Sequence, residues 1–254
     1  MVRKINEDSG LVGHQILAIA DGMGGHVAGE IASSIAINAL MPLDSTISLA
    51  SPVDDDAITD FLLHTLAGVD DQIGAMIDAD PKLEGMGTTL TAFIFNSNRI
   101  AIVHVGDSRC YRFRDGRIDQ LTRDHTLVQE LVDQGRITEN EALEHPQRSL
   151  LTQALMGHRD VVPDIQLYDA RSGDRFLLCS DGLSGVIPIS ELHELLAAES
   201  ITDALDQLIG AAMKRGAPDN VSAIVVDLVA AASMMEPSQI TAGATAIGAA
   251  AGQV

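Results

Sequence analysis

The feature that most limits the possible folds is a series of short apolar runs separated by turns of only a few residues. Thr88–Phe95, Ile100–Val105 and Cys110–Phe113 are rich in the β-branched, aromatic and aliphatic residues that favour strands. Asp115-Gly116, after the third run, is a hairpin turn sequence. Connections this short join antiparallel strands, because a parallel pair needs a crossover of a dozen or more residues. The sequence therefore predicts an antiparallel sheet in the middle of the chain.

Helical patterns and further strands surround this region. Apolar residues recur at helical spacing over 28–39, where Pro42 is expected to end the helix, and again over 58–77. A polar helical pattern covers residues 125–145, and shorter helices are expected at 190–197 and 202–214. Further strands are expected at about 16–20, 150–155, 164–168, 175–179 and 220–228. Strands and helices do not alternate regularly, so the predicted fold class is α+β.

The composition is uniform up to about residue 230 and then changes. From that point the chain is mostly Ala, Gly, Thr and Ser and carries few bulky side chains. We therefore expect one domain over residues 1–229, followed by an Ala/Gly-rich flexible tail over residues 230–254.

The charge balance limits the possible partners. The 254-residue chain has 16 Lys and Arg against 36 Asp and Glu, a formal net charge of −20. A field of this sign repels nucleic-acid phosphates and anionic lipids, so we expect no nucleic-acid partner. No apolar stretch is long enough to predict a membrane span. Cys110 and Cys179 both lie inside apolar runs, which is typical of a reduced, cytoplasmic protein.

Four aspartates occur next to strands that are apolar enough to be central. These are Asp21, Asp107, Asp181 and Asp219. One interpretation is local turn chemistry, because Asp-Gly and Asp-Asn pairs favour turns. The other is that the four converge, in which case bare carboxylates ~4 Å apart repel by roughly 4 kcal/mol at an effective dielectric constant near 20. Such a cluster takes up protons or hard cations such as Mg²⁺ or Mn²⁺, because its donors are all oxygens.

Six motifs then occur in a fixed order. They are Arg3-x-x-Asn6-Glu7-Asp8, Ala20-Asp21-Gly22-Met23-Gly24-Gly25-His26-x-x-Gly29-Glu30, Gly85-Met86-Gly87-Thr88-Thr89, Gly106-Asp107-Ser108-Arg109, Ser180-Asp181-Gly182-Leu183 and Pro218-Asp219-Asn220-Val221-Ser222. Over about residues 3–228 the chain resembles the PPM/PP2C-type protein serine/threonine phosphatases. The Asp-Gly-Met-Gly-Gly-His form and the run at 145–149 resemble the bacterial branch, in particular its actinobacterial members. The resemblance implies a four-layer sandwich of two antiparallel sheets flanked by helices.

The resemblance also implies a metal site with two Mn²⁺ or Mg²⁺ ions. Asp21 would bridge both ions, the carbonyl of Gly22 would complete the shell of one, and Asp181 and Asp219 would hold the other. Bacterial relatives often bind a third ion. Here that ion would fall to Asp107 and Asp181, with Ser149 either as a ligand or as an ordinary residue at the start of a strand.

Further roles follow from the same resemblance. Glu7 and Asp8 would anchor water molecules bound to the metal ions. Arg3 matches the arginine that grips the substrate phosphate with two hydrogen bonds. His26 is the candidate proton donor to the leaving group, since Met23 stands where many eukaryotic relatives have histidine. Residues 124–149 match the mobile flap of the family.

The expected function is hydrolysis of phosphoserine and phosphothreonine on proteins by a metal-bridged hydroxide. The enzyme is expected to act as a monomer and to oppose bacterial Ser/Thr kinases. A second hypothesis is a catalytically impaired member that acts as a phosphoprotein-binding regulatory module. A third is an acidic metal-storage protein, which would bind metal without turnover. Relatives usually have a strand ahead of the arginine, whereas Arg3 here follows two residues. Either the sequence starts too late or the sheet lacks that edge strand, and the second option would loosen Arg3.

Overall fold

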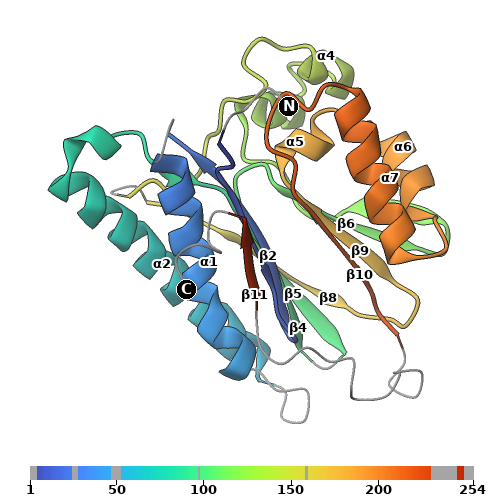
Figure 1. Cartoon of the computed structure of the whole chain (residues 1–254), viewed down its shortest axis with the longest axis horizontal. Coiled ribbons are helices and arrows are strands. Elements are labelled where there is room, and N and C mark those ends of the chain that lie inside the picture. Colours follow the sequence, from blue (N-terminus) through green and yellow to red (C-terminus); the bar gives the residue numbers. More distant parts are fainter. Residues whose placement is uncertain are drawn as a thin grey trace.

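The computed structural model describes residues 5–24, 28–46, 53–96, 98–157, 160–229 and 245–248. Within them, two antiparallel sheets face each other and helices cover the outer side of each sheet, which gives four layers (Figure 1). The predicted α+β class and the predicted α-β-β-α sandwich are both confirmed.

The first sheet has seven strands among the described residues, in the order β11-β1-β2-β4-β5-β8, with β3 beside β2. Their bounds are β1 Asp8–Val12, β2 Ile16–Met23, β3 Gly87–Thr88, β4 Leu90–Asn96, β5 Arg99–Val105, β8 Asp164–Asp169 and β11 Thr245–Gly248. The turn between β4 and β5 is short, as the sequence predicts, and it fixes a register in which Leu90 faces Val105 and Asn96 faces Arg99.

The second sheet has four strands in the order β10-β9-β6-β7. Their bounds are β6 Arg109–Arg114, β7 Arg117–Gln120, β9 Arg175–Cys179 and β10 Ala223–Asp227. The strand expected at 150–155 does not form. That segment makes only isolated bridges from Leu151 to Thr126 and from Leu155 to Thr88, because its two partners lie on different segments and neither continues beside it.

Two long helices cover the first sheet, and shorter ones cover the second (Figure 1). The helix bounds are α1 Ala28–Thr46, α2 Asp55–Ala79, α5 Asp181–Ser184, α6 Ile189–Leu196 and α7 Ile201–Lys214, with a 3₁₀ turn, η1, at Pro81–Leu83. The prediction that Pro42 ends the first helix is wrong, since α1 continues to Thr46. Proline lacks only one helical hydrogen bond, and the buried side chains of Leu40 and Leu43 on either side keep the last turn packed.

Buried apolar side chains form a cluster between each pair of layers. One cluster joins α1 and α2 to the first sheet, one lies between the sheets around Phe93 and Phe176, and one joins the second sheet to α6 and α7. The Phe93 and Phe176 rings meet edge to face with centroids 5.0 Å apart. These clusters hold the two sheets in fixed relation, so the strand ends at the rim of the sandwich are also held.

The flap predicted at 124–149 contains two short helices, α3 (Leu127–Asp133) and α4 (Glu139–Leu143). Thr126 caps α3 and Thr138 caps α4, the latter in a capping box with Glu141. At the other end of the chain, β11 lies within the predicted tail and pairs with β1, while residues 230–244 and 249–254 lie outside the described residues. In the described part of the chain, no helix has the length and apolar character required to cross a bilayer.

Candidate metal centre

One cleft collects most of the residues that the sequence singles out. It has a volume of about 540 Å³ and lies where strand ends of both sheets meet the flap. Its lining residues are Glu7, Asp21, Gly22, Met23, Gly24, Thr89, Asp107, Ser149, Leu150, Leu151, Met156, Asp181 and Asp219. All four aspartates therefore share one cleft with Glu7, Gly22 and Ser149. Arg3 and His26 lie outside the described residues.

Thr89 holds Asp21 beside the turn that carries Asp107. The Asp21 amide donates to Thr89 Oγ1 at 3.0 Å, and the Thr89 amide donates to the Asp21 carbonyl at 2.9 Å. Thr89 Oγ1 also shares a 2.8 Å hydrogen bond with Ser108 Oγ, directly after Asp107. The motif at 85–89 therefore positions two aspartates from two different strands.

Glycine next to Asp21 permits a close backbone approach. A Cβ at Gly22 would lie 2.1 Å from the Gly29 carbonyl oxygen and 2.6 Å from that of Glu7. The Gly22 amide donates to this same Glu7 carbonyl. Glycine is therefore required after Asp21, because only a residue without a side chain lets β2, the segment before β1 and the start of α1 pack this closely.

Asp8 connects the two sheets at the floor of the cleft. It lies directly opposite Asp21 in the β1–β2 ladder, and its side chain is 1% exposed. Asp8 Oδ2 accepts hydrogen bonds from Ser180 Oγ at 3.0 Å and Ser222 Oγ at 2.6 Å. Asp8 Oδ1 accepts none from the residues that the structure describes.

Burial and mutual repulsion shift the carboxylates toward their protonated forms. Burial raises the pKa of Asp21 well above its usual range, and the nearby carboxylates of Asp8, Asp181 and Asp107 raise it further. Burial likewise raises the pKa of Asp107 to about 7, assisted by Asp181 and Asp124 and opposed by Arg109. Burial raises the pKa of Asp8 to about 6, although hydrogen bonds from Ser222 and Ser180 lower it. A site with these properties is stabilised by added positive charge.

The donor set fits hard divalent cations. Every side-chain donor of the predicted ligand set is an oxygen, which suits Mg²⁺ or Mn²⁺ better than Zn²⁺. Asp8 Oδ1 is a buried acceptor that a metal-held water would satisfy. Among the described residues, no three His, Cys, Asp or Glu side chains are already gathered closely enough to enclose an ion, so the acids line the walls of the cleft.

Asn220 is a site residue that the sequence analysis did not single out. Its Oδ1 accepts from the Glu7 amide at 3.0 Å, and its Nδ2 donates to the Ile5 carbonyl at 3.1 Å. It thereby ties the segment before β1 to the loop that carries Asp219. The Asp219-Asn220 pair was the available signal, but turn chemistry accounts for such a pair without a contact more than 200 residues away.

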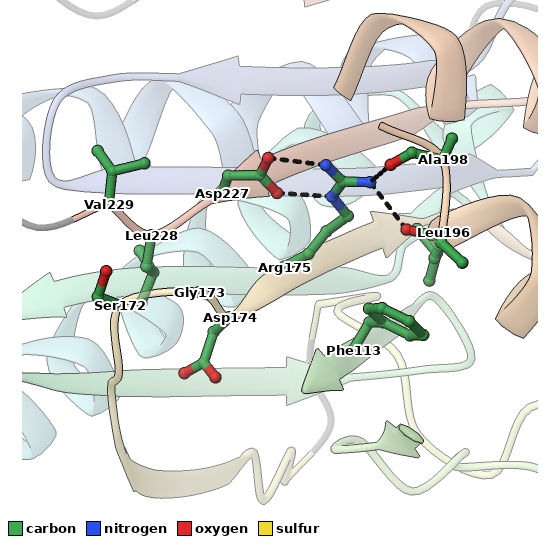
Figure 2. Close-up of a pocket in the computed structure, with 11 residues that line it drawn as sticks. Phe113, Ser172, Gly173, Asp174, Arg175, Leu196, Ala198, Asp227, Leu228 and Val229 are labelled. Carbon is green, nitrogen blue, oxygen red and sulfur yellow. Dashed lines mark hydrogen bonds and ion pairs between the residues drawn. The ribbon is translucent and has the colours of Figure 1, made fainter. Parts of the chain in front are cut away.

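A second cleft, of about 360 Å³, lies at the opposite end of β9 from Asp181. Arg175 occupies it and pairs with Asp227 through two hydrogen bonds of 2.6 and 2.8 Å (Figure 2). The same guanidinium donates to the carbonyls of Leu196 and Ala198 at the end of α6. Asp174, at its edge, accepts from Arg114 and from the Arg171 amide. These partners make the cleft a junction between β9, β10 and α6.

Comparison with known proteins agrees with this geometry. Residues 5–227 match the family model described as Protein phosphatase 2C. The serine/threonine protein phosphatase PstP of Mycobacterium tuberculosis is 48% identical over 232 residues, which are 90% of this chain and 43% of that protein. The chain thus spans less than half the length of this curated relative. The serine/threonine phosphatase stp of Listeria monocytogenes is 34% identical over 232 residues, covering 89% of this chain and 91% of that protein.

A solved structure extends the likeness to three dimensions. The crystal structure of the catalytic domain of PstP in complex with two manganese ions has a TM-score of 0.82 and 45% sequence identity to this chain. The match covers 91% of this chain and 94% of that one. The family resemblance stated from the ordered motifs is confirmed: the chain belongs to the protein phosphatase 2C family.

Proposed function

We propose that this chain is a metal-dependent protein serine/threonine phosphatase that hydrolyses phosphoserine and phosphothreonine on proteins. The observation that carries the proposal is the single cleft in which Asp21, Asp107, Asp181 and Asp219 converge with raised carboxyl pKa values at two of them. The manganese-bound PstP structure supports the proposal, because its fold matches over nearly the whole described domain. Mn²⁺ or Mg²⁺ is the proposed cofactor, with two ions in the core site and a third beside Asp107.

The residues that line the cleft are proposed to bind different metal ions. Asp21 would contact both ions of the core site, the Gly22 carbonyl would complete the shell of one, and Asp181 and Asp219 would hold the other. Asp107 and Asp181 would hold the third ion, with Ser149 as a further ligand. When bound, divalent cations acidify water and neutralise charge on the phosphoryl group.

Residues around these ligands orient water and substrate. Asp8, fixed by Ser180 and Ser222, would hold a water through its second carboxylate oxygen, and Glu7 would do the same from the adjacent position. Arg3 would bind two phosphate oxygens, and His26 would give a proton to the serine or threonine oxygen as it leaves. Both lie outside the described residues, so these two roles rest on their motif positions.

The setting in the cell is part of the same proposal. The substrates would be phosphoproteins, including bacterial Ser/Thr kinases, and the enzyme would act as a monomer. Burial raises the pKa of the Cys110 thiol, and both it and Cys179 are buried thiols without a disulfide. Unoxidised buried thiols fit a cytoplasmic location.

The experiment is turnover of a phosphothreonine peptide in Mn²⁺, Mg²⁺ or Ca²⁺, with and without EDTA. We expect Mn²⁺ to support turnover, EDTA to abolish it, and Asp181→Asn to reduce it by about 100-fold or more. Asp115→Asn is the matched control, because Asp115 is exposed on the β6–β7 hairpin at a φ of 51° that asparagine tolerates. Undiminished turnover in Asp181→Asn would refute the metal assignment, and Mn²⁺ binding without turnover would favour the regulatory or storage alternatives.

A further inference from the structure

His125 is a buried residue to which the mechanism assigns no role. It lies at the start of the flap and is 3% exposed. Its ring packs on that of His104 with centroids 4.9 Å apart. Its contacts reach three separate segments: the turn before Asp107, the far end of the flap and β8.

The strongest contact is a reciprocal pair with Gly106. The Gly106 amide donates to His125 Nδ1 at 3.2 Å, and the His125 amide donates to the Gly106 carbonyl at 2.7 Å. An amide can only donate, so Nδ1 is the unprotonated nitrogen and Nε2 carries the hydrogen. Nε2 lies 3.3 Å from Asp164 Oδ2, which accepts it. The ring is therefore fixed from both sides in one tautomer.

Gly106 is the residue immediately before Asp107, and its conformation is constrained. Its φ is 106°, and a Cβ there would lie 2.6 Å from the Thr89 methyl group. The direction in which Asp107 leaves β5 therefore depends on the peptide that His125 holds. Asp107 itself lines the metal cleft.

The backbone of His125 also anchors the other end of the flap. The Thr152 amide donates to the His125 carbonyl at 2.8 Å, and the Leu127 amide donates to the Leu150 carbonyl at 2.9 Å. Thr126 and Leu151 form an antiparallel bridge between these contacts. The two ends of the flap are thus paired with each other, and this pairing carries Leu150 and Leu151 to the wall of the cleft.

We propose that His125 is a positioning residue that couples the flap to the cation bound beside Asp107, by holding the Gly106 peptide with Nδ1. This rests on the proposed function, because it concerns the third ion of the same cleft. His125 does not touch the ion or the substrate. It sets the angle of Asp107, and a shift at the base of the flap changes that angle through the His125 backbone.

Two substitutions of His125 distinguish the role of Nδ1 from that of Nε2. In His125→Asn the side-chain oxygen can take the place of Nδ1 and accept from Gly106, whereas in His125→Gln the amide reaches toward Asp164 and no acceptor remains for Gly106. Mn²⁺ binding to the full chain is measured by isothermal titration calorimetry. We expect His125→Gln to weaken the Mn²⁺ site beside Asp107, which we take to be the weakest of the three, by about tenfold or more, the cost of one unsatisfied buried donor. We expect His125→Asn to weaken it by about threefold or less.

Asp164→Asn is the control on the other side of the ring. It retains an acceptor for Nε2 and is expected to leave Mn²⁺ affinity unchanged.

Turnover gives a second readout: His125→Gln should need about tenfold more Mn²⁺ for half-maximal activity, with kcat at saturating Mn²⁺ within about twofold of the parent protein. Equal Mn²⁺ affinities in His125→Gln and His125→Asn would overturn the positioning role.

A measurement on the unsubstituted protein covers the case in which His125→Gln does not fold. With ¹⁵N-labelled histidine, NMR should show Nδ1 of His125 unprotonated, and its resonance should shift over the Mg²⁺ range that fills the weakest site. An unmoved His125 resonance at saturating Mg²⁺ would overturn the inference. Absence of any Mn²⁺ binding or turnover by the parent protein would instead refute the proposed function, so the two failures are distinguishable.

Discussion

At the scale of single residues, the cleft depends on backbones that approach more closely than any side chain permits. Gly182, directly after Asp181, is the tightest case. A Cβ there would lie 1.8 Å from the Asn220 carbonyl oxygen, a distance that requires the backbone to move. Gly182 therefore sets the spacing between the Asp181 and Asp219 loops.

Replacing this glycine should damage both stability and metal binding. We expect Gly182→Ala to lower the free energy of unfolding by about 3 kcal/mol, as an overpacked contact against backbone does. Urea unfolding measures it, with Gly210→Ala as the matched control. Gly210 lies in α7 with nothing within 4 Å of its missing Cβ, so alanine should raise stability by about 0.5–1 kcal/mol. Equal stabilities in the two variants would contradict the account of the Gly182 contact.

His104 should contribute a pH-dependent component to stability. Burial and the neighbouring His125 together lower the pKa of His104 from 6.5 to about 4, against the opposing effect of the acidic side chains of Asp124 and Asp164. Below pH 6.5, His104 therefore binds a proton in the unfolded chain, whereas in the folded chain it binds one only near pH 4. The stability of the folded state must fall across that interval as pH falls.

The test compares the parent protein with His104→Gln, since the acidic cluster contributes equally to both. Urea unfolding between pH 7 and 4 should show that the parent loses about 1–3 kcal/mol more than the variant. Parallel pH curves for the two proteins would show that folding does not lower the pKa of His104.

At the scale of elements, the outer edge of the first sheet is the least expected feature. The strand β11, from the end of the chain, pairs with β1 in a register that places Ser9 opposite Gly248 and Val12 opposite Thr245. β1 therefore has partners on both sides, β2 and β11. Pairing on both sides restrains the segment that carries Asp8, because it satisfies the backbone groups that an edge strand exposes.

Gly248 allows a direct test of this edge. Its φ is 74°, and a Cβ there would lie 2.4 Å from the Asp8 carbonyl oxygen. We expect Gly248→Ala to displace β11 and to increase hydrogen exchange of the amides of residues 8–12 by about tenfold or more. Gly135→Ala is the control, since Gly135 has a similar φ of 66° but open space around its missing Cβ. Unchanged exchange at residues 8–12 would show that β11 does not protect β1.

Local patterns predicted the elements well, and long-range contacts account for what they missed. The alternation and turn residues between 88 and 113 fixed three strands, and the Asp-Gly pairs marked two walls of the cleft. The contacts of Asn220 with Glu7 and of His125 with Gly106 could not be predicted, because only the fold brings these partners near. Residues 150–155 have strand-like composition, but no neighbour runs beside them.

At the scale of the whole molecule, the four layers explain why acidic residues distant in sequence share one cleft. The apolar cluster between the sheets fixes the ends of β2 and β9, so that Asp21 and Asp181 line the same cleft despite their mutual repulsion. Hydrophobic burial along the strands thus offsets an electrostatic cost at their ends. Cations bound there would remove that cost.

The central claim is that this cleft binds paired divalent cations, and anomalous X-ray diffraction from crystals soaked in Mn²⁺ tests it most directly. Data collected at the manganese absorption edge should show two strong peaks between Asp21, Asp181 and Asp219, and a third beside Asp107. Crystals of Asp21→Asn should lose at least one of the two central peaks. Crystals of the parent protein with no anomalous peak in the cleft at saturating Mn²⁺ would contradict the account.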